Sequence, residues 1–203
     1  MHNGRFAIQT GGMERQEPRQ ITDAKVLAAV SHPLRRRLMD ALRVYGPATA
    51  SVLAEHTGQS VANVSHHLRV LGTAELIEEA PELARDRRER WWRLVAPSLR
   101  WSTADFNEDP VSAAVATAAE SLNLDHHVAM VRAWYAAGEE ERAAWDNAPF
   151  STDKWLRLTP QELHRFEAEL LELVNRWAGR DVPDDGARRD PVFFFAFGVP
   201  GRP

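Results

Sequence analysis

Apolar side chains recur along most of the chain with helical spacing, and this pattern predicts a mainly helical protein. The first four such segments are residues 22–30, 33–45, 49–56 and 60–71. Pro33 stands in the first turn of the second segment, and Gly46 and Pro47 end it. Ser60 is the expected N-cap of the fourth segment, and Gly72 is expected to close it. We therefore expect four consecutive helices.

Two short β-prone segments, AELIEE and RWWRLV, follow the fourth helix. They flank residues 80–89, which are rich in arginine and predict the tip of a β-hairpin. Trp91 and Trp92 are consecutive in a strand, so their side chains point to opposite faces and only one is expected in the core. Two helices joined by a short turn and followed by a hairpin indicate a winged helix-turn-helix.

These segments also resemble a known family. The stretches AVSHPLRRRLMDAL, LAEHTGQSVANVSHHLRVLGTAELIEE and RRERWWRLV resemble the ArsR-type bacterial transcriptional regulators. The likeness is greatest to the longer members, which carry an extra C-terminal domain, and it covers about residues 22–96. The resemblance implies a homodimeric repressor that places two recognition helices in successive major grooves of a pseudo-palindromic operator. It also implies that the helix after the wing builds the dimer interface.

A long helix is expected over residues 110–137. Val111, Val115, Ala118 and Leu122 fall at heptad spacing, which suits a dimer interface. A short acidic helix is expected over residues 138–145.

The last part of the chain predicts a small α/β unit. Thr159 and Glu162 form a capping box for a helix that Gly179 ends. Residues 151–158 predict a strand, and residues 192–197 predict a second strand, antiparallel to the first and covered on both faces.

The expected fold class is therefore α+β and mainly α, in four parts. These are a disordered leader (1–20), the winged helix-turn-helix domain (21–97), a linker with dimerisation helices (98–149) and the α/β unit (150–203).

Composition narrows the function classes. The 203 residues include no cysteine, which excludes disulfides, thiolate metal sites and cysteine nucleophiles. No apolar run is long enough to span a bilayer, and the N-terminus lacks a signal-peptide core, so we expect a cytoplasmic protein without a membrane partner. The net charge of −4 argues against nucleic acid, but it hides an asymmetry. Residues 1–100 carry 15 Lys and Arg against 11 Asp and Glu, whereas residues 101–203 carry 10 against 18.

The basic half holds the candidate DNA-binding residues. An α-helix fits the major groove and presents its N-terminal side chains to base edges, and asparagine can pair with adenine through two hydrogen bonds. On the helix at 60–71 and just before it, these residues are Gln59, Ser60, Asn63, Ser65 and His66, with Arg69 placed for phosphate. On the wing they are Arg85, Arg87 and Arg88, which are expected to enter a minor groove. The alternative is that both sets are ordinary solvated surface. His67 lies closer to the apolar stripe, so we expect it to be packed and hydrogen-bonded.

Metal sensing and catalysis find little support. His126 and His127 point about 100° apart on a helix and have no partner three or four residues further on, so we expect surface or interface residues and no metal or cofactor. No phosphate-binding glycine loop, G-x-S-x-G or H-E-x-x-H is present, so we expect no enzyme.

Aromatic residues concentrate in the C-terminal region, and one hypothesis is a pocket for a small hydrophobic effector. Its candidate residues are Trp134, Trp155, Phe193 and Phe195. The alternative is that they form the core of the small unit. Two further functions also stay open: a winged helix that binds protein, and an effector-binding protein with weak DNA binding.

Overall fold

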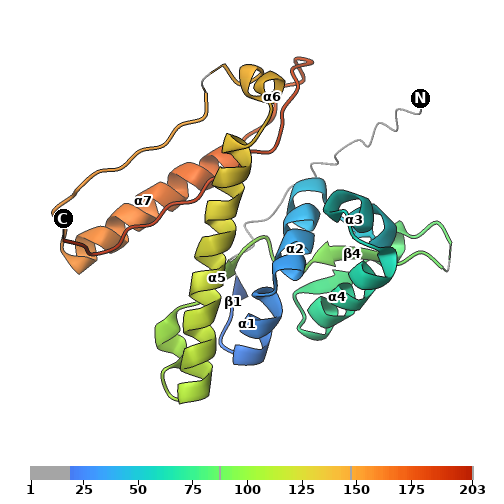
Figure 1. Cartoon of the computed structure of the whole chain (residues 1–203), viewed down its shortest axis with the longest axis horizontal. Coiled ribbons are helices and arrows are strands. Elements are labelled where there is room, and N and C mark those ends of the chain that lie inside the picture. Colours follow the sequence, from blue (N-terminus) through green and yellow to red (C-terminus); the bar gives the residue numbers. More distant parts are fainter. Residues whose placement is uncertain (1–18, 87, 147, 203) are drawn as a thin grey trace. The chain divides into compact units, whose positions relative to one another are not determined.

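The computed structural model describes residues 19–86, 88–146 and 148–202, which belong to two compact units that divide between Ala129 and Met130 (Figure 1). Neither predicted boundary, at 97/98 or at 149/150, coincides with this division. The first part of the long helix therefore belongs to the same unit as the winged helix.

Four helices open the first unit, as predicted. They are α1 (Ala24–Val30), α2 (Pro33–Tyr45), α3 (Ala50–Thr57) and α4 (Val61–Thr73). Each begins where a polar side chain accepts a backbone N–H of the first turn, which satisfies a donor that the helix itself cannot. These caps are Asp23, His32, Thr49 and Ser60. Asp23 caps α1, so the helix starts one residue later than a Thr22 cap would place it.

The apolar stripes of these helices meet in one core. The side chains of Leu27, Leu38, Leu53 and Leu68, one from each of the four helices, are at most 1% exposed. Burying side chains of this size supplies most of the favourable free energy of folding in a domain like this.

The wing is a three-stranded antiparallel sheet in the order β2 (Ala48–Thr49), β4 (Trp91–Leu94) and β3 (Ile77–Glu79). A single 3₁₀ turn, η1 (Pro81–Leu83), follows β3. The prediction for the consecutive tryptophans is confirmed, because Trp92 is buried and Trp91 only half-buried.

Gly72 does not end α4, as the sequence suggested, but lies within its last turn. A Cβ atom at Gly72 would stand 3.1 Å from the Trp92 ring, so the glycine lets the helix and the sheet approach closely.

Residues on either side of the winged helix also pair. β1 (Arg19–Gln20) runs parallel to β5 (Leu99–Arg100), so residues 19 and 20 do not belong to a disordered leader, and residues 1–18 lie outside the described part. After the turn η2 (Thr103–Phe106), helix α5 (Pro110–Tyr135) begins. Phe106 on this turn and Ala116 and Ala119 on α5 are buried in the core of the first unit.

The second unit contains the end of α5 and two further helices, α6 (Glu139–Ala143) and α7 (Pro160–Ala178). The predicted capping box is confirmed, because Thr159 and Glu162 each accept the other's backbone N–H. Residues 151–158 and 192–197 form no strand, so the prediction of a two-stranded α/β unit is wrong.

Residues 192–197 form no strand because no neighbouring segment in the described part of the chain offers backbone groups with which a strand could pair. The rings of Phe193 and Phe195 stack with their centroids 5.8 Å apart, and the segment extends beside α7, where Gly198 lies against Leu163. A helix whose backbone hydrogen bonds are already made cannot continue a ladder. No residue of the described part of 148–202 is buried, and Phe194 is 47% exposed, so neither face of the segment is covered as expected.

Candidate nucleic-acid interface

The turn between α3 and α4 sets the direction of α4. Gly58 has φ of 65°, the left-handed region that glycine adopts without strain, and its N–H donates back to the Ala54 carbonyl to close α3. Only Gly58, Gln59 and Ser60 separate the two helices. This is the short turn of a helix-turn-helix, and it leaves the start of α4 open to solvent.

The predicted base-reading residues surround the first two turns of α4. Ser60 is the N-cap, with its hydroxyl oxygen 3.3 Å from the N–H of Asn63. The Asn63 side-chain amide donates to the Gln59 side-chain oxygen at 3.0 Å, so these two side chains orient each other. Ser65 is half-buried and His66 is exposed.

Arg69 lies one turn further along the helix and is also exposed. The structure therefore leaves the predicted side chains of this helix accessible while Val64 and Leu68 enter the core.

His67 lies on the inner side of α4, and its predicted burial is confirmed at 8% exposure. Its ring packs 4.6 Å from the His32 ring, but among the described residues its Nδ1 has no hydrogen-bond partner, so the expected hydrogen bond there is missing. Burial, together with the positive charge of Arg35 and the neighbouring histidines, lowers the pKa of His67. The ring is therefore neutral at pH 7.

The tip of the wing presents Arg85 and Arg88 to solvent, while Arg87 lies outside the described residues. The two carboxylates at the wing tip accept backbone N–H groups. Asp86 accepts the N–H of Arg88 at 2.6 Å, and Glu89 accepts the N–H of Arg85 at 3.0 Å. These bonds shape the turn. The hydrogen bonds from Arg85 and from the Trp91 ring hold the pKa of Glu89 below its usual range.

The arginines nearer the base of the wing are paired. Arg90 lies 3.5 Å from Glu79, and Arg93 contacts both Glu78 and Glu82. Within the described residues no carboxylate pairs with the guanidinium of Arg85 or Arg88, so these two side chains are available to an external anion.

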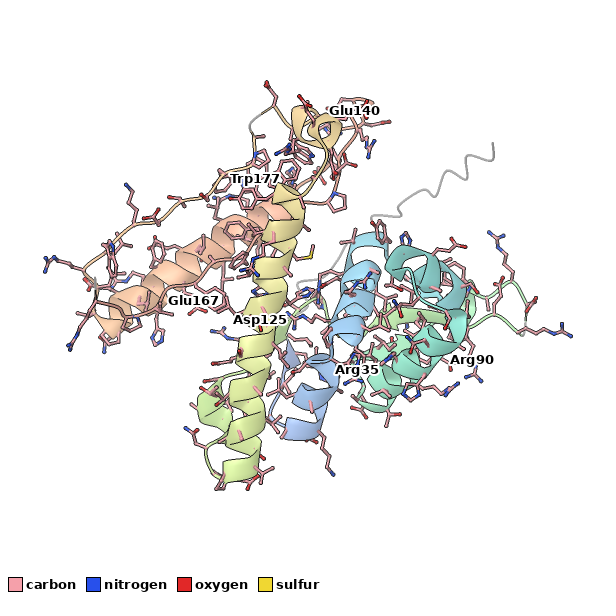
Figure 2. All side chains as sticks on the ribbon, in the orientation of Figure 1. Arg35, Arg90, Asp125, Glu140, Glu167 and Trp177 are labelled. Carbon is pink, nitrogen blue, oxygen red and sulfur yellow. The ribbon has the colours of Figure 1, made fainter. Side chains whose placement is uncertain are left out.

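The three arginines at the start of α2 contact the protein itself. Arg35, labelled in Figure 2, donates to backbone carbonyls of α1, one of them Ala28 at 3.1 Å. Arg37 donates to the Thr57 carbonyl at 2.8 Å. Arg36 donates to the side chain of Asn123 on α5. We conclude that this triplet connects helices of the fold.

Sequence reasoning missed one polar group. Asp40 had no assigned role, yet its carboxylate lies 2.8 Å from Nε2 of His126 on α5. The ring of His126 is 16% exposed and bonds within the chain, a contact that the prediction of a surface or interface residue did not include. The two residues are 86 positions apart, and no local pattern connects them.

The candidate effector residues lie in the second unit. Trp134 is half-buried on α5, and Trp155 is 70% exposed in the segment before α7. Phe193 and Phe195 lie side by side, as described above. No group of three or more histidines and carboxylates that could bind a metal is found in the described part, and no helix there is long and apolar enough to cross a membrane.

Helices α2, α3 and α4 with the β3–β4 wing define a winged helix-turn-helix domain. Comparison with known proteins agrees. Residues 30–80 match the family model described as a helix-turn-helix domain. Over 54 residues the chain is 43% identical to the transcriptional repressor SdpR of Bacillus subtilis (strain 168). That alignment covers 27% of this chain and 59% of the repressor.

Two solved structures are also similar. One is the crystal structure of a possible transcriptional regulator for arsenical resistance, at 26% identity and a TM-score of 0.30, covering 64% of this chain and 98% of that one. The other is an apo mutant of Lactococcus lactis ZitR, at 16% identity and a TM-score of 0.28, covering 75% and 83%.

The chain thus contains a winged helix-turn-helix domain, and the curated relative that it matches over part of its length is a transcriptional repressor.

Proposed function

We propose that this protein is a homodimeric transcriptional repressor that binds a pseudo-palindromic DNA operator. The observation that carries the proposal is the open polar start of α4 next to a wing whose tip arginines have no carboxylate partner in the described part of the chain. Its similarity to SdpR, itself a repressor, supports repression as the direction of regulation.

Each side chain has a chemical role at the operator. Asn63 pairs with adenine in the major groove, where Gln59 orients its amide, and His66 reads a neighbouring acceptor. Arg69 contacts phosphate. Arg85 and Arg88 enter the adjacent minor groove, where narrow A·T tracts concentrate negative potential.

A stripe on α5 supports the dimer. Val111, Ala118 and Leu122, which the heptad pattern assigned to the interface, are exposed, and Val115 is half-buried. Val111 is 72% exposed, an unfavourable position for valine unless another molecule covers it. Two copies joined along this stripe would present two recognition helices to successive turns of DNA.

The first experiment selects fragments from random DNA with the purified protein and measures binding to the recovered site by fluorescence anisotropy. Replacing Ser65 and His66 by alanine should weaken binding by tenfold or more, since each lost base contact costs about 1–3 kcal/mol. Thr73→Ala, at the exposed far end of the same helix, is the matched control and should bind like the wild type. Equal DNA affinity in all three proteins would exclude α4 as the helix that contacts the bases.

A selection that recovers no DNA would favour the alternative of a winged helix that binds protein or of a C-terminal effector site. For the latter we propose a small apolar ligand beside Trp155 and the Phe193–Phe195 pair. A panel of apolar ligands should then shift the tryptophan fluorescence, and an unchanged spectrum across the panel would count against this site.

A further inference from the structure

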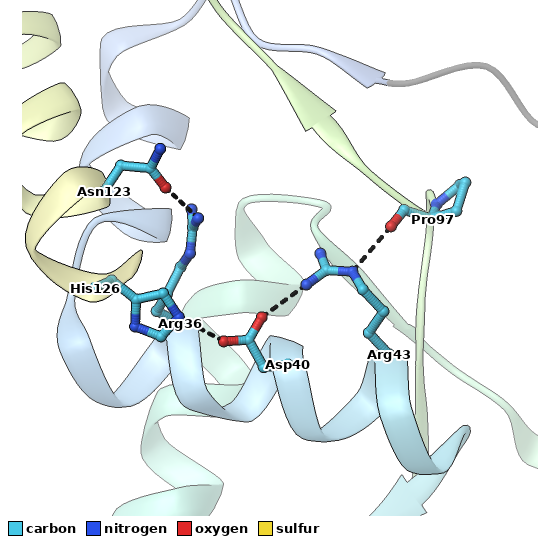
Figure 3. A network of polar contacts seen from close by, with 6 residues as sticks. All are labelled: Arg36, Asp40, Arg43, Pro97, Asn123 and His126. Carbon is cyan, nitrogen blue, oxygen red and sulfur yellow. Dashed lines mark hydrogen bonds and ion pairs between the residues drawn. The ribbon is translucent and has the colours of Figure 1, made fainter. Parts of the chain in front are cut away.

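Two side-chain contacts connect the winged helix to α5 (Figure 3). Arg36 donates to the side-chain oxygen of Asn123, and Nε2 of His126 donates to the Asp40 carboxylate at 2.8 Å. A carboxylate can only accept, so the proton of this bond lies on the ring nitrogen. We call these four residues the polar clamp.

Asp40 is fixed from both sides. Its second carboxylate oxygen accepts from Arg43 at 2.7 Å, and Arg43 also donates to the Pro97 carbonyl at 3.0 Å, just after the wing. Burial raises the pKa of Asp40, but the His126 hydrogen bond and the charges of Arg43 and Arg36 more than offset this and hold it below its usual range. The carboxylate is therefore ionised at neutral pH, and it links α2, α5 and the base of the wing.

The contacts that bind α5 to the winged helix lie on one face of the helix. Ala116 and Ala119 are its two buried residues, and Asn123 and His126 follow at spacings of four and three. With a rise of 1.5 Å per residue, Ala116 and His126 are about 15 Å apart along the axis. The alanine side chains pack closely in this core but make no directional polar contact. The directional restraint therefore comes from the polar clamp.

We propose that the polar clamp fixes the angle at which α5 leaves the winged helix, and that in the dimer it thereby sets the operator half-site spacing that the protein accepts. This inference rests on the proposed function, because it requires a dimer joined along α5. The exposed stripe at Val111, Ala118 and Leu122 lies on a different face of α5 from Asn123 and His126. The polar clamp and the second subunit can therefore contact α5 at the same time.

The proposal makes the four clamp residues positioning residues and not DNA contacts. One base pair of spacing shifts a half-site by about 3.4 Å along the duplex axis. It also rotates the half-site by roughly 35°, since a helical turn takes about 10–10.5 base pairs. A rigid dimer rejects such a displacement, whereas a dimer with loosened α5 helices can follow it.

The test measures affinity for the selected operator, for versions with one or two base pairs added or removed between the half-sites, and for a duplex with one half-site. The variants are Asp40→Ala with Asn123→Ala, which removes both contacts, and the isosteric Asp40→Asn, which removes only charge. Glu120→Ala, at an exposed position on α5, is the control. Sedimentation confirms that each variant remains dimeric and folded.

The wild type and Glu120→Ala should prefer one spacing by at least tenfold. The double variant should keep its half-site affinity within about twofold but bind all spacings within about threefold of one another, with Asp40→Asn in between. An unchanged spacing preference in the double variant would overturn the proposal, as would an equal loss on half-site and full operator, which indicates a merely structural role. Absence of any DNA binding by the wild type would instead reject the proposed function, and this inference with it.

Discussion

Removing a single wing-tip charge gives a quantitative test of the proposed interface. The Arg88 guanidinium is exposed and has no carboxylate partner among the described residues, so in the minor groove, where we propose that it enters, it is free to neutralise the charge of the flanking phosphates. Each phosphate that a protein neutralises contributes about 0.9 to the negative slope of log K against log salt. A dimer carries two copies, so Arg88→Ala should reduce that slope by about 1.8. Between 50 and 200 mM salt, the variant should therefore lose about 12-fold less affinity than the wild type.

The assay is fluorescence anisotropy on the selected operator at five or more salt concentrations. Arg93→Ala is the matched control, because it removes the same charge from the same hairpin, but from a guanidinium that already contacts Glu78 at 2.7 Å and also Glu82. Its slope should stay within about 0.5 of the wild-type slope. If both variants reduce the slope of log K against log salt by the same amount, the slope depends only on the net charge of the protein and the wing makes no specific phosphate contact. If neither does, the wing tip is a solvated turn.

Two further predictions concern the stability of the first unit. Gly72→Val should lower the free energy of unfolding by about 1–3 kcal/mol in urea titrations, because even its Cβ would lie 3.1 Å from the Trp92 ring. Burial lowers the pKa of His67 in the folded protein, so the unfolded chain binds a proton more readily than the folded one. The free energy of unfolding should therefore keep its full value above about pH 6.5, the usual pKa of histidine, and decrease as the pH falls below it. Urea titrations at pH 7.5 and 5.5 measure this loss, and His67→Leu should make it smaller; an equal loss in the variant would contradict the assignment.

The winged helix could be predicted closely because its signals are local. Pro33 and Ser60 mark helix starts, and the consecutive Trp91 and Trp92 predict that one of the two side chains is buried and the other is not. A capping side chain or a period-two alternation acts within a few residues, so sequence alone determines it. Gly72 shows the limit of such signals. A glycine near a helix end fits a C-cap equally well, and only the packed structure reveals that Trp92 requires it.

The remaining features depend on contacts between distant segments, which no window of sequence contains. Asp40 and His126 meet only after the chain has folded. Residues 192–197 have the apolar composition of a buried strand, but a strand also needs a neighbour with free backbone groups, and the segment extends beside a helix. Composition therefore predicts a strand where the described part of the fold supplies no strand to pair with it. The same distinction applies to the proposed function: the proposed DNA-reading side chains lie on α4 and the wing and follow from local sequence, whereas the proposed half-site spacing depends on contacts between α2 and α5 that only the folded chain shows.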